Sequence, residues 1–376
     1  MNIAVDIDDT LTDSFDYFLP FVAAYFGAPE AELREKNISY GNLPEAWKSR
    51  ELDFCRACYD RTAVDTPFKP DAAWGVNRLR EMGHRIVIIT ARTREFYTDP
   101  YKTTREELTK GGISYDTLIC TFNKGEACER EQISLLIDDQ PANCADAVTH
   151  GIPALLFDSK ANRDAQSLCR RVKNWAEAVE AAAQIQRGYP DREAAAQLLE
   201  EALLQNPGRW GDHSRVAAEC AEKVAGECGL DSEKAYVLGL LHDVGRRFRV
   251  RDLGHLYYGY RYMMALGYPA VAKICLSHSF PNQDMSLYIG QIDIPEPEAK
   301  EAERLLTEME FDDYDRLVQL CDALASADGV VDVEQRMADV KRRYGRYPQP
   351  QWNKNLEYLR YFGAKAGRPV YEIVGK

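Results

Sequence analysis

Short apolar runs alternate with segments of helical patterning over the first half of the chain. The runs begin at Ile3, His84, Tyr115, Ile133 and Ala154, and each ends in polar or acidic residues. Runs this short and rich in Val and Ile are typical of strands that are buried on both faces. Their alternation with helices predicts an α/β fold, with a parallel sheet and helices on both of its faces.

Residues 13–71 interrupt this alternation between the first two strands. Aromatic residues recur there at spacings of three and four, and glycines and prolines divide the segment into several short helices. An insertion at this point would lie over the carboxyl end of the first strand, so we expect a helical cap. Most of the aromatic side chains are expected to form the cap's own small core.

The second half of the chain is patterned for helices. An Ala- and Glu-rich stretch begins at Trp175 and is broken by Arg187-Gly-Tyr-Pro190, so we place a domain boundary between residues 188 and 189. Residues 189–376 are expected to form an all-α domain, with one short strand at 369–374. The stretch 347–376 carries no motif and either wraps over this domain or makes a dimer contact. Helices are expected at 191–204, 213–228, 233–242, 255–266, 270–278 and 313–325.

Composition and charge narrow the class of partner. The 376 residues are 45% apolar and 28% charged, which suggests two domains that fold throughout. A formal net charge of −13 disfavours nucleic-acid polymers, whereas a small anion can still bind beside a site cation. Neither a signal-peptide pattern nor an apolar run of membrane-spanning length is visible, so we expect a cytoplasmic protein with no membrane partner. Whether the chain forms a homo-oligomer stays open.

The ten cysteines are scattered along the chain and are expected to be reduced and mostly buried. Cys55 and Cys58 form a C-x-x-C pair, a spacing that can bind a metal or exchange disulfides. No second pair accompanies them, and the flanking residues look like a surface helix. We therefore interpret this pair as structural.

Residues suited to phosphoryl transfer stand at or just after the ends of the expected strands. They are Asp6, Asp8, Thr90, Lys124, Asp138 and Asp139. The carboxyl ends of parallel strands meet at one edge of a sheet, where ligands collect. Crowded carboxylates are costly to desolvate, and they suit Mg²⁺ with a phosphate beside it.

These residues can be given roles in the hydrolysis of a phosphate ester. Asp6 is the natural nucleophile, and Asp8 is the acid/base that protonates the leaving alcohol and later activates water. Thr90 could hydrogen-bond the phosphoryl group and Lys124 could balance its charge. The pair Asp138-Asp139 would complete a Mg²⁺ site with the first two aspartates. Each residue alone is more often a turn former or a helix cap, whereas the ordered set indicates a hydrolytic site.

The motifs Asp6-Ile-Asp8-Asp-Thr-Leu, Thr90-Ala-Arg92, Lys124 and Asp138-Asp139 resemble the four motifs of the haloacid dehalogenase-like (HAD) phosphatase superfamily. Within it, Thr90-Ala-Arg92 and the stretch 136–144 look most like the 5'(3')-deoxyribonucleotidases. The resemblance covers about residues 1–185, cap included. It implies a Rossmann-like fold and a Mg²⁺-dependent phosphomonoesterase with Asp6 as nucleophile. Arg92 would contact the substrate. That this substrate is a nucleotide is a looser inference from the same resemblance.

Four of the six histidines lie in the helical half, on expected helices or at their ends. They are His213, His242, His255 and His278. Asp322 stands within an apolar helical stretch, where a carboxylate needs a partner. Imidazoles and carboxylates that converge in a helical core form a site for Fe, Mn or another first-row ion. For any single one of these residues, a satisfied core side chain is the simpler interpretation.

Together, His213, the His242-Asp243 doublet and Asp322 resemble the HD-domain metal-dependent phosphohydrolases, over about residues 189–345. The resemblance implies that these four side chains bind a metal ion and that Arg246, in Leu240-Leu-His-Asp-Val-Gly-Arg246, contacts phosphate. His255 and His278 occupy places where dinuclear branches of the family supply further ligands. Those branches often have another histidine where Ser279 stands here, so sites with one and with two ions (Fe or Mn) both stay open.

The leading hypothesis is a bifunctional phosphohydrolase acting on nucleotides. Residues 1–188 would hydrolyse monoesters through an aspartyl-phosphate, and residues 189–376 would use metal-activated water on a phosphoester or phosphoanhydride. One alternative leaves the HD domain non-catalytic, as a nucleotide sensor or an oligomerisation module. Another is a regulatory protein that binds phosphorylated ligands without turnover, which the intact Asp8 disfavours because binding needs no acid/base.

Overall fold

The computed structural model describes residues 1–167 and 169–376 and divides into two compact units. The first consists of Met1–Gln186 with Ala265–Gly267, and the second of Arg187–Met264 with Tyr268–Lys376. A parallel sheet organises the first unit, and helices make up almost all of the second.

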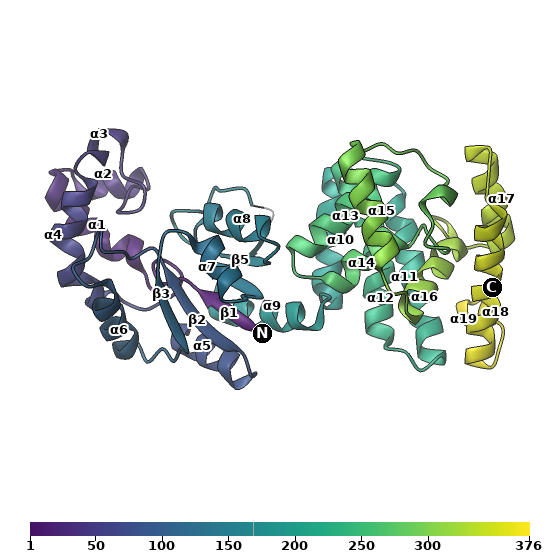
Figure 1. Cartoon of the computed structure of the whole chain (residues 1–376), viewed down its shortest axis with the longest axis horizontal. Coiled ribbons are helices and arrows are strands. Elements are labelled where there is room, and N and C mark those ends of the chain that lie inside the picture. The colour runs from purple at the N-terminus through teal and green to yellow at the C-terminus, as the bar shows by residue number, and fades with distance from the viewer. Residues whose placement is uncertain (168) are drawn as a thin grey trace. The chain divides into compact units, whose positions relative to one another are not determined.

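Among the described residues, the sheet of the first unit has six strands, all parallel (Figure 1). In spatial order they are β3 (Thr117–Cys120), β2 (Arg85–Thr90), β1 (Asn2–Val5), β4 (Leu135–Asp138), β5 (Ala154–Phe157) and β6 (Arg170–Val172). The central strand β1 pairs Ile3 with Ile86 on one side and with Leu135 on the other. These three side chains are fully buried, which explains why the central strands read as continuous apolar runs.

Helices surround the sheet, as predicted. They are α5 (Ala72–Glu81), α6 (Pro100–Lys110), α7 (Lys124–Arg130), α8 (Pro141–Thr149) and α9 (Trp175–Arg187). Ala127 of α7 and Ala147 of α8 share one core cluster with Ala4 of β1. Elsewhere α5 packs against α9, where Gly75 leaves room for the indole of Trp175; a Cβ at Gly75 would lie 2.6 Å from that ring.

The predicted cap is present between β1 and β2. It contains α1 (Ser14–Phe26), α2 (Glu30–Glu35), α3 (Glu45–Lys48), α4 (Glu51–Thr62) and the 3₁₀ helix η1 (Ala63–Asp65). Phe18, Phe54 and Tyr59 are buried in a cluster of their own, so the cap has its own aromatic core as expected. The chain enters and leaves it side by side, because Thr12 and Phe68 form an antiparallel bridge.

The second unit is helical except for one two-stranded hairpin, within the part of the chain that the structure describes. Its helices are α10 (Arg192–Gln205), α11 (Trp210–Glu227), α12 (Ser232–Leu241), η2 (Val244–Phe248), α13 (Leu253–Ala265), α14 (Pro269–Ser277), η3 (Met285–Leu287), α15 (Glu296–Glu308), α16 (Asp313–Leu324), α17 (Val333–Tyr344), α18 (Gln349–Ala366) and α19 (Val370–Val374). The hairpin consists of β7 (Ala325–Ser326) and β8 (Gly329–Val330).

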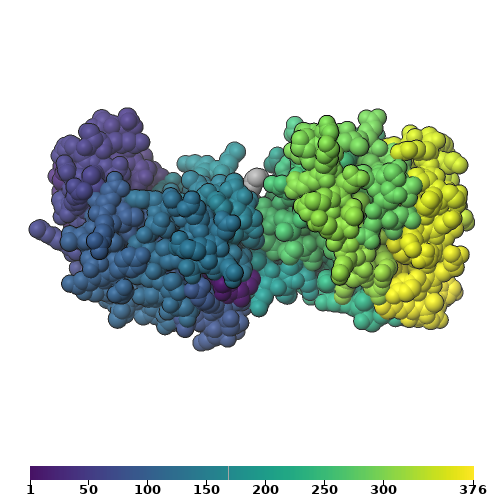
Figure 2. Space-filling model, viewed as in Figure 1, coloured from purple at the N-terminus to yellow at the C-terminus, as the bar shows by residue number. Residues whose placement is uncertain are grey.

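The C-terminal stretch wraps over the helical unit. Tyr358 and Phe362 of α18 are buried in the same core cluster as α11 and α16 side chains, and the yellow surface in Figure 2 covers one side of this unit. The expected strand at 369–374 is wrong, because these residues form α19. Pro369 precedes the helix, and Val370, Ile373 and Val374 recur at helical spacing and face the core.

Most of the ten cysteines are buried, as predicted. All ten are free, and Cys55 and Cys58 lie on α4, the first buried and the second partly exposed. Among the described residues, no helix combines the length and the apolar character needed to cross a membrane.

Candidate active sites

The first cluster of polar side chains lies at the carboxyl edge of the sheet, around Lys124. The Nζ atom of Lys124 lies 2.7 Å from Oδ1 of Asp6 and 2.7 Å from Oδ2 of Asp138. Asp6 follows β1 and Asp138 ends the neighbouring β4, so sheet pairing places the two carboxylates side by side. All three side chains are buried. Burial disfavours the charged amine, but Asp138 and Asp6 outweigh it and raise the pKa of Lys124.

Three carboxylates of this cluster form a candidate metal site. Asp6, Asp138 and Asp139 each offer one oxygen, and these oxygens lie within 4.8 Å of one another. Burial raises the pKa of Asp6 to about 7 and that of Asp139 well above its usual range, and neighbouring carboxylates add to both shifts. One lysine cannot balance three buried carboxylates, whereas a hard divalent cation can. The donor set therefore fits Mg²⁺.

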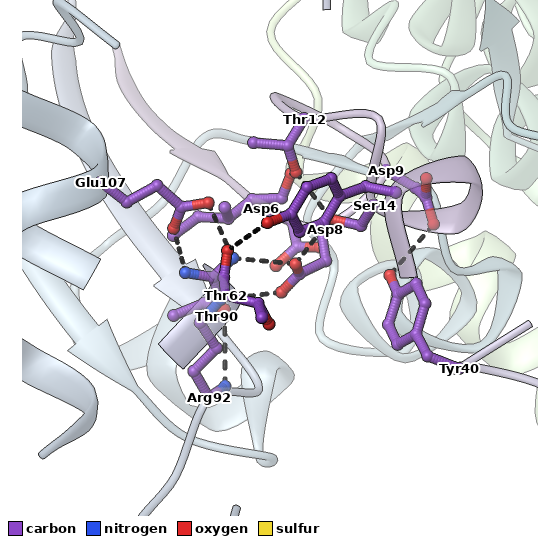
Figure 3. Close-up of polar contacts among 12 residues, drawn as sticks. Asp6, Asp8, Asp9, Thr12, Ser14, Tyr40, Thr62, Thr90, Arg92 and Glu107 are labelled. Carbon is purple, nitrogen blue, oxygen red and sulfur yellow. Dashed lines mark hydrogen bonds and ion pairs between the residues drawn. The ribbon is translucent and has the colours of Figure 1, made fainter. Parts of the chain in front are cut away.

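Asp8 lies beside this group but faces Arg92 instead (Figure 3). The Nε and Nη2 atoms of Arg92 donate to its two carboxylate oxygens at 2.9 and 2.8 Å, and Ser14 Oγ donates to Oδ1 at 2.8 Å. Burial acts to raise the pKa of Asp8, but Arg92 outweighs it and lowers that pKa. The contact with Arg92 thus favours the ionised form of Asp8, and its carboxylate is not among the three that could share a metal ion.

Arg92 is held from its other side by Glu107 of α6, a residue that the sequence interpretation missed. Arg92 is 2% exposed and Glu107 is 0% exposed. The Nη2 atom donates to Glu107 Oε1 at 3.2 Å, and Nη1 contacts Oε2. Two carboxylates thus occupy the guanidinium that was expected to contact substrate. The sequence offered one signal for a role of Glu107: this acid stands next to Leu108 and one turn after Thr103 and Thr104, all on the buried face of α6.

Two neighbouring turns complete this edge of the sheet. Thr90, the last residue of β2, is fully buried, and its Oγ1 accepts from the backbone N–H of Arg92 at 3.4 Å. Asp9 has a φ of 59°, in the left-handed region, and accepts from the Tyr40 hydroxyl at 3.0 Å. Tyr40 belongs to the cap segment, so the cap contacts the turn that carries Asp6 and Asp8.

A second cluster gathers the histidines of the helical unit around Asp243. Its Oδ1 lies 3.0 Å from His255 Nε2 and 3.6 Å from His278 Nε2, while its Oδ2 lies 3.9 Å from His242 Nε2. His213 of α11 adjoins them, with Nε2 3.0 Å from Asp322 Oδ1. The structure therefore brings together all six predicted ligands. Two sets offer ligand atoms within 4.8 Å, namely His213 with His242 and Asp322, and His242 with Asp243 and His278.

The hydrogen bonds of the imidazoles show that this cluster fits a metal ion. His242, His255 and His278 bond through Nδ1 to backbone carbonyl oxygens, at 2.7, 2.5 and 3.1 Å. A carbonyl only accepts, so each Nδ1 carries the proton and each Nε2 presents a lone pair. Burial lowers the pKa of His242, and lowers that of His278 to about 3, which keeps both rings neutral. Lone pairs facing carboxylate oxygens need a cation between them.

Two local features hold Asp243 in place. Arg246 donates from Nε to Asp243 Oδ2 at 2.6 Å, so the predicted phosphate contact adjoins the cluster. Gly245 lets η2 lie directly on α13, since a Cβ there would come within 1.9 Å of the His255 backbone oxygen. A cavity of about 440 Å³ opens beside the cluster, with Arg246, His213 and Asp322 in its lining.

Comparisons with known proteins agree with the two clusters. Residues 1–186 match the family model described as "5' nucleotidase, deoxy (Pyrimidine), cytosolic type C protein", and residues 210–327 match the HD domain. A search of curated proteins finds no match.

Solved structures similar to the chain include three phosphatases or hydrolases. A predicted phosphatase from Clostridium acetobutylicum is 14% identical, with 49% of this chain and 98% of that chain covered and a TM-score of 0.38. A D,D-heptose 1,7-bisphosphate phosphatase from B. bronchiseptica, complexed with magnesium and phosphate, is 11% identical, with 49% and 99% covered and a TM-score of 0.31. A HAD family hydrolase from Deinococcus radiodurans, with bound phosphate and sodium, is 14% identical, with 49% and 94% covered and a TM-score of 0.34.

Both matched families are metal-dependent phosphohydrolases, and both have candidate metal-binding groups here. The chain is therefore a phosphohydrolase that combines, over residues 1–186, a nucleotidase-type domain of the HAD superfamily with, over residues 210–327, a domain of the HD family.

Proposed function

We propose that the chain is a bifunctional phosphohydrolase acting on nucleotides, with separate catalytic centres on either side of a boundary between residues 188 and 189. The observation that supports the first centre most is the buried group of Asp6, Lys124 and Asp138, with two Nζ–carboxylate distances of 2.7 Å. The second rests on three imidazoles that bond through Nδ1 to backbone carbonyl oxygens and present Nε2 toward Asp243.

In the first centre, Asp6 attacks the phosphorus of a monoester. The new bond to the carboxylate oxygen forms as the bond to the alcohol oxygen breaks, and the alcohol takes a proton from Asp8. Water, whose proton passes to Asp8, then attacks the phosphorus of the aspartyl-phosphate; the bond to the Asp6 oxygen breaks, inorganic phosphate is released and the Asp6 carboxylate is regenerated. Lys124 balances phosphoryl charge and Thr90 hydrogen-bonds the phosphoryl oxygen. Mg²⁺ held by Asp6, Asp138 and Asp139 would neutralise the crowded negative charges.

Arg92 sets the proton chemistry of Asp8. While the guanidinium contacts Asp8, the lowered pKa suits the second step, in which the carboxylate receives a proton. The first step requires a protonated Asp8, so the Arg92 contact has to loosen when the substrate binds. The Nε atom of Arg92 is then released from Asp8 while Nη1 stays with Glu107, and Nε can contact the substrate, the role expected from the motif.

The test of the first centre is the chemical state of Asp6 during turnover. Rapid acid quenching with a nucleoside monophosphate, followed by borohydride reduction, should convert phosphorylated Asp6 to homoserine, detectable by peptide mass spectrometry. Asp6→Asn should show no such product and no Mg²⁺-dependent phosphate release. Asp53→Asn, at an exposed position of α4, is the control and should behave as wild type. Unchanged turnover in Asp6→Asn would rule out the nucleophile.

In the second centre, the histidines and aspartates would hold one or two Fe or Mn ions, and these ions would lower the pKa of a water molecule for attack on phosphorus. Arg246 positions the phosphate group. The test is elemental analysis of the purified chain. His242→Ala and Asp322→Ala should each lose the bound transition metal, whereas His150→Ala, a histidine of α8's exposed end, should retain it. A wild-type chain that takes up no metal on reconstitution would contradict the proposal.

A further inference from the structure

Residues from outside the matched HD segment form part of the lining of the cavity beside the HD cluster. One part of its lining comes from that segment, including Arg246 and Gln319. Another part comes from α17, α18 and the loop between them, which follow residue 327 and contribute Arg336, Gln351 and Tyr347 respectively to the lining. The C-terminal helices therefore complete this site as well as covering the core, and they can select what binds in it.

The cavity is cationic although the chain is strongly acidic. Five arginines and three aspartates line it, whereas the whole chain has a formal net charge of −13. Two of the three aspartates, Asp243 and Asp322, belong to the candidate metal sets, so bound metal would leave the arginines in greater excess. Among the described residues, Arg251 and Arg336 have no carboxylate within ion-pair distance. Two unpaired guanidinium groups beyond Arg246 indicate a ligand with more than one anionic group.

The same cavity also presents acceptors that lack a donor. Gln351 is 2% exposed and Gln319 is 3% exposed, and the Oε1 atom of each has no hydrogen-bond partner within the described chain. Their Nε2 atoms donate to the carbonyl oxygens of Ser279 and Ser277, at 3.4 and 3.0 Å, which fixes which end of each amide is free. An ionised phosphate has no proton to give these oxygens, whereas a ribose hydroxyl or a base N–H does.

We infer that this cavity binds a nucleotide with at least two linked phosphates, and that the C-terminal helices provide its selectivity. Arg246 binds one phosphate beside the cluster, whose side chains would hold a cation to offset its charge, and Arg251 and Arg336 bind the next. The amide oxygen of Gln351 accepts a hydrogen bond from the nucleoside. A cavity of about 440 Å³ is within the range for such ligands, roughly 300–1,000 Å³. The inference deepens the proposed function of the second centre and rests on that site being a phosphate site.

The test is calorimetric binding to the full-length, metal-reconstituted chain carrying Asp6→Asn. The probes are the α,β-methylene diphosphates of adenosine and uridine, which are not hydrolysed, the matching monophosphates, and methylenediphosphonate. At least one diphosphate should bind ten times more tightly than its monophosphate. Arg336→Ala should weaken diphosphate binding by about tenfold and monophosphate binding by much less. Arg342→Ala, an exposed neighbour on α17 paired with Asp339, is the matched control and should change neither.

Gln351 is tested separately because it is buried. Gln351→Met keeps the volume and removes the amide, so it should weaken nucleoside diphosphate binding while methylenediphosphonate still binds as in wild type. That retained binding also shows an intact fold. Gln349→Met, exposed in the first turn of α18, is the control.

Equal affinity for mono- and diphosphates, or equal effects of Arg336→Ala and Arg342→Ala, would overturn the inference. A diphosphate preference without any turnover would leave the inference standing and refute catalysis at this site. Turnover of monophosphates alone at this site would support catalysis and refute the inference.

Discussion

Replacement of Glu107 by Gln tests the buried chain of charges behind Asp8. Arg92 donates four contacts to carboxylates, two to Asp8 and two to Glu107, and Arg92 and Glu107 are almost completely buried. Removing one partner of a buried pair costs about 3–5 kcal/mol because the other charge is left uncompensated. Asp8 stays beside Arg92 and is partly exposed, so we expect the lower end, about 3 kcal/mol of unfolding free energy for the first unit.

Hydrogen exchange is the suitable assay, since a chain with two compact units need not unfold in one transition. In Glu107→Gln, amides of β1, β2 and α6 that open only with the whole unit should exchange roughly 100-fold faster, while those of α11 and α16 keep their wild-type rates. The control is Glu81→Gln, whose exposed pair with Arg78 should change exchange by less than about threefold. A Glu107→Gln effect as small as that of the control would refute the buried-charge reasoning.

Three further predictions address other parts of the chain. Lys124→Met should abolish monoester hydrolysis, measured by phosphate release, and should destabilise the first unit by about 3–5 kcal/mol because two buried carboxylates lose their counter-charge. Hydrogen exchange measures the loss of stability, and a first unit as stable as wild type would contradict the prediction. Gly245→Ala should displace α13, because the new Cβ would meet the His255 backbone, and should thereby lower the metal content of the HD unit. Elemental analysis measures the metal content, and a full metal content would argue against that contact. Metal removal with a chelator should lower the melting temperature of the helical unit, with recovery on adding Mn²⁺; an unchanged melting temperature would mean that the cluster holds no stabilising ion.

Much of the first unit could be predicted because its strands are short, apolar and buried on both faces. β2 and β4 end in polar residues that break the apolar run, so Thr90 and Asp138 marked both a strand end and a candidate site. β6 was missed, since Arg170 and Arg171 make an edge strand that reads as polar. The stretch 369–374 was misread because three β-branched residues in a short run favour a strand, whereas its burial follows helical spacing.

The candidate sites were predictable to the extent that chemistry marks single residues. Histidines on helical faces and aspartates at strand ends stand out, and the structure brings those residues into two clusters. Asp8 could not be assigned a partner from the sequence, since its contact with Arg92 spans 84 positions. Glu107 was missed for the same reason, because a buried face on α6 does not reveal which cation it meets. Gln351 of α18 lies outside any motif, and only tertiary packing places it at the cavity.

We propose that one chain contains two independent hydrolytic centres. The most direct measurement is phosphate release from a panel of nucleoside mono-, di- and triphosphates by wild type, Asp6→Asn and His242→Ala. We predict that Asp6→Asn loses monophosphate hydrolysis and keeps its polyphosphate activity, while His242→Ala shows the reverse. Loss of both activities in either folded variant, or loss of neither, would contradict the account.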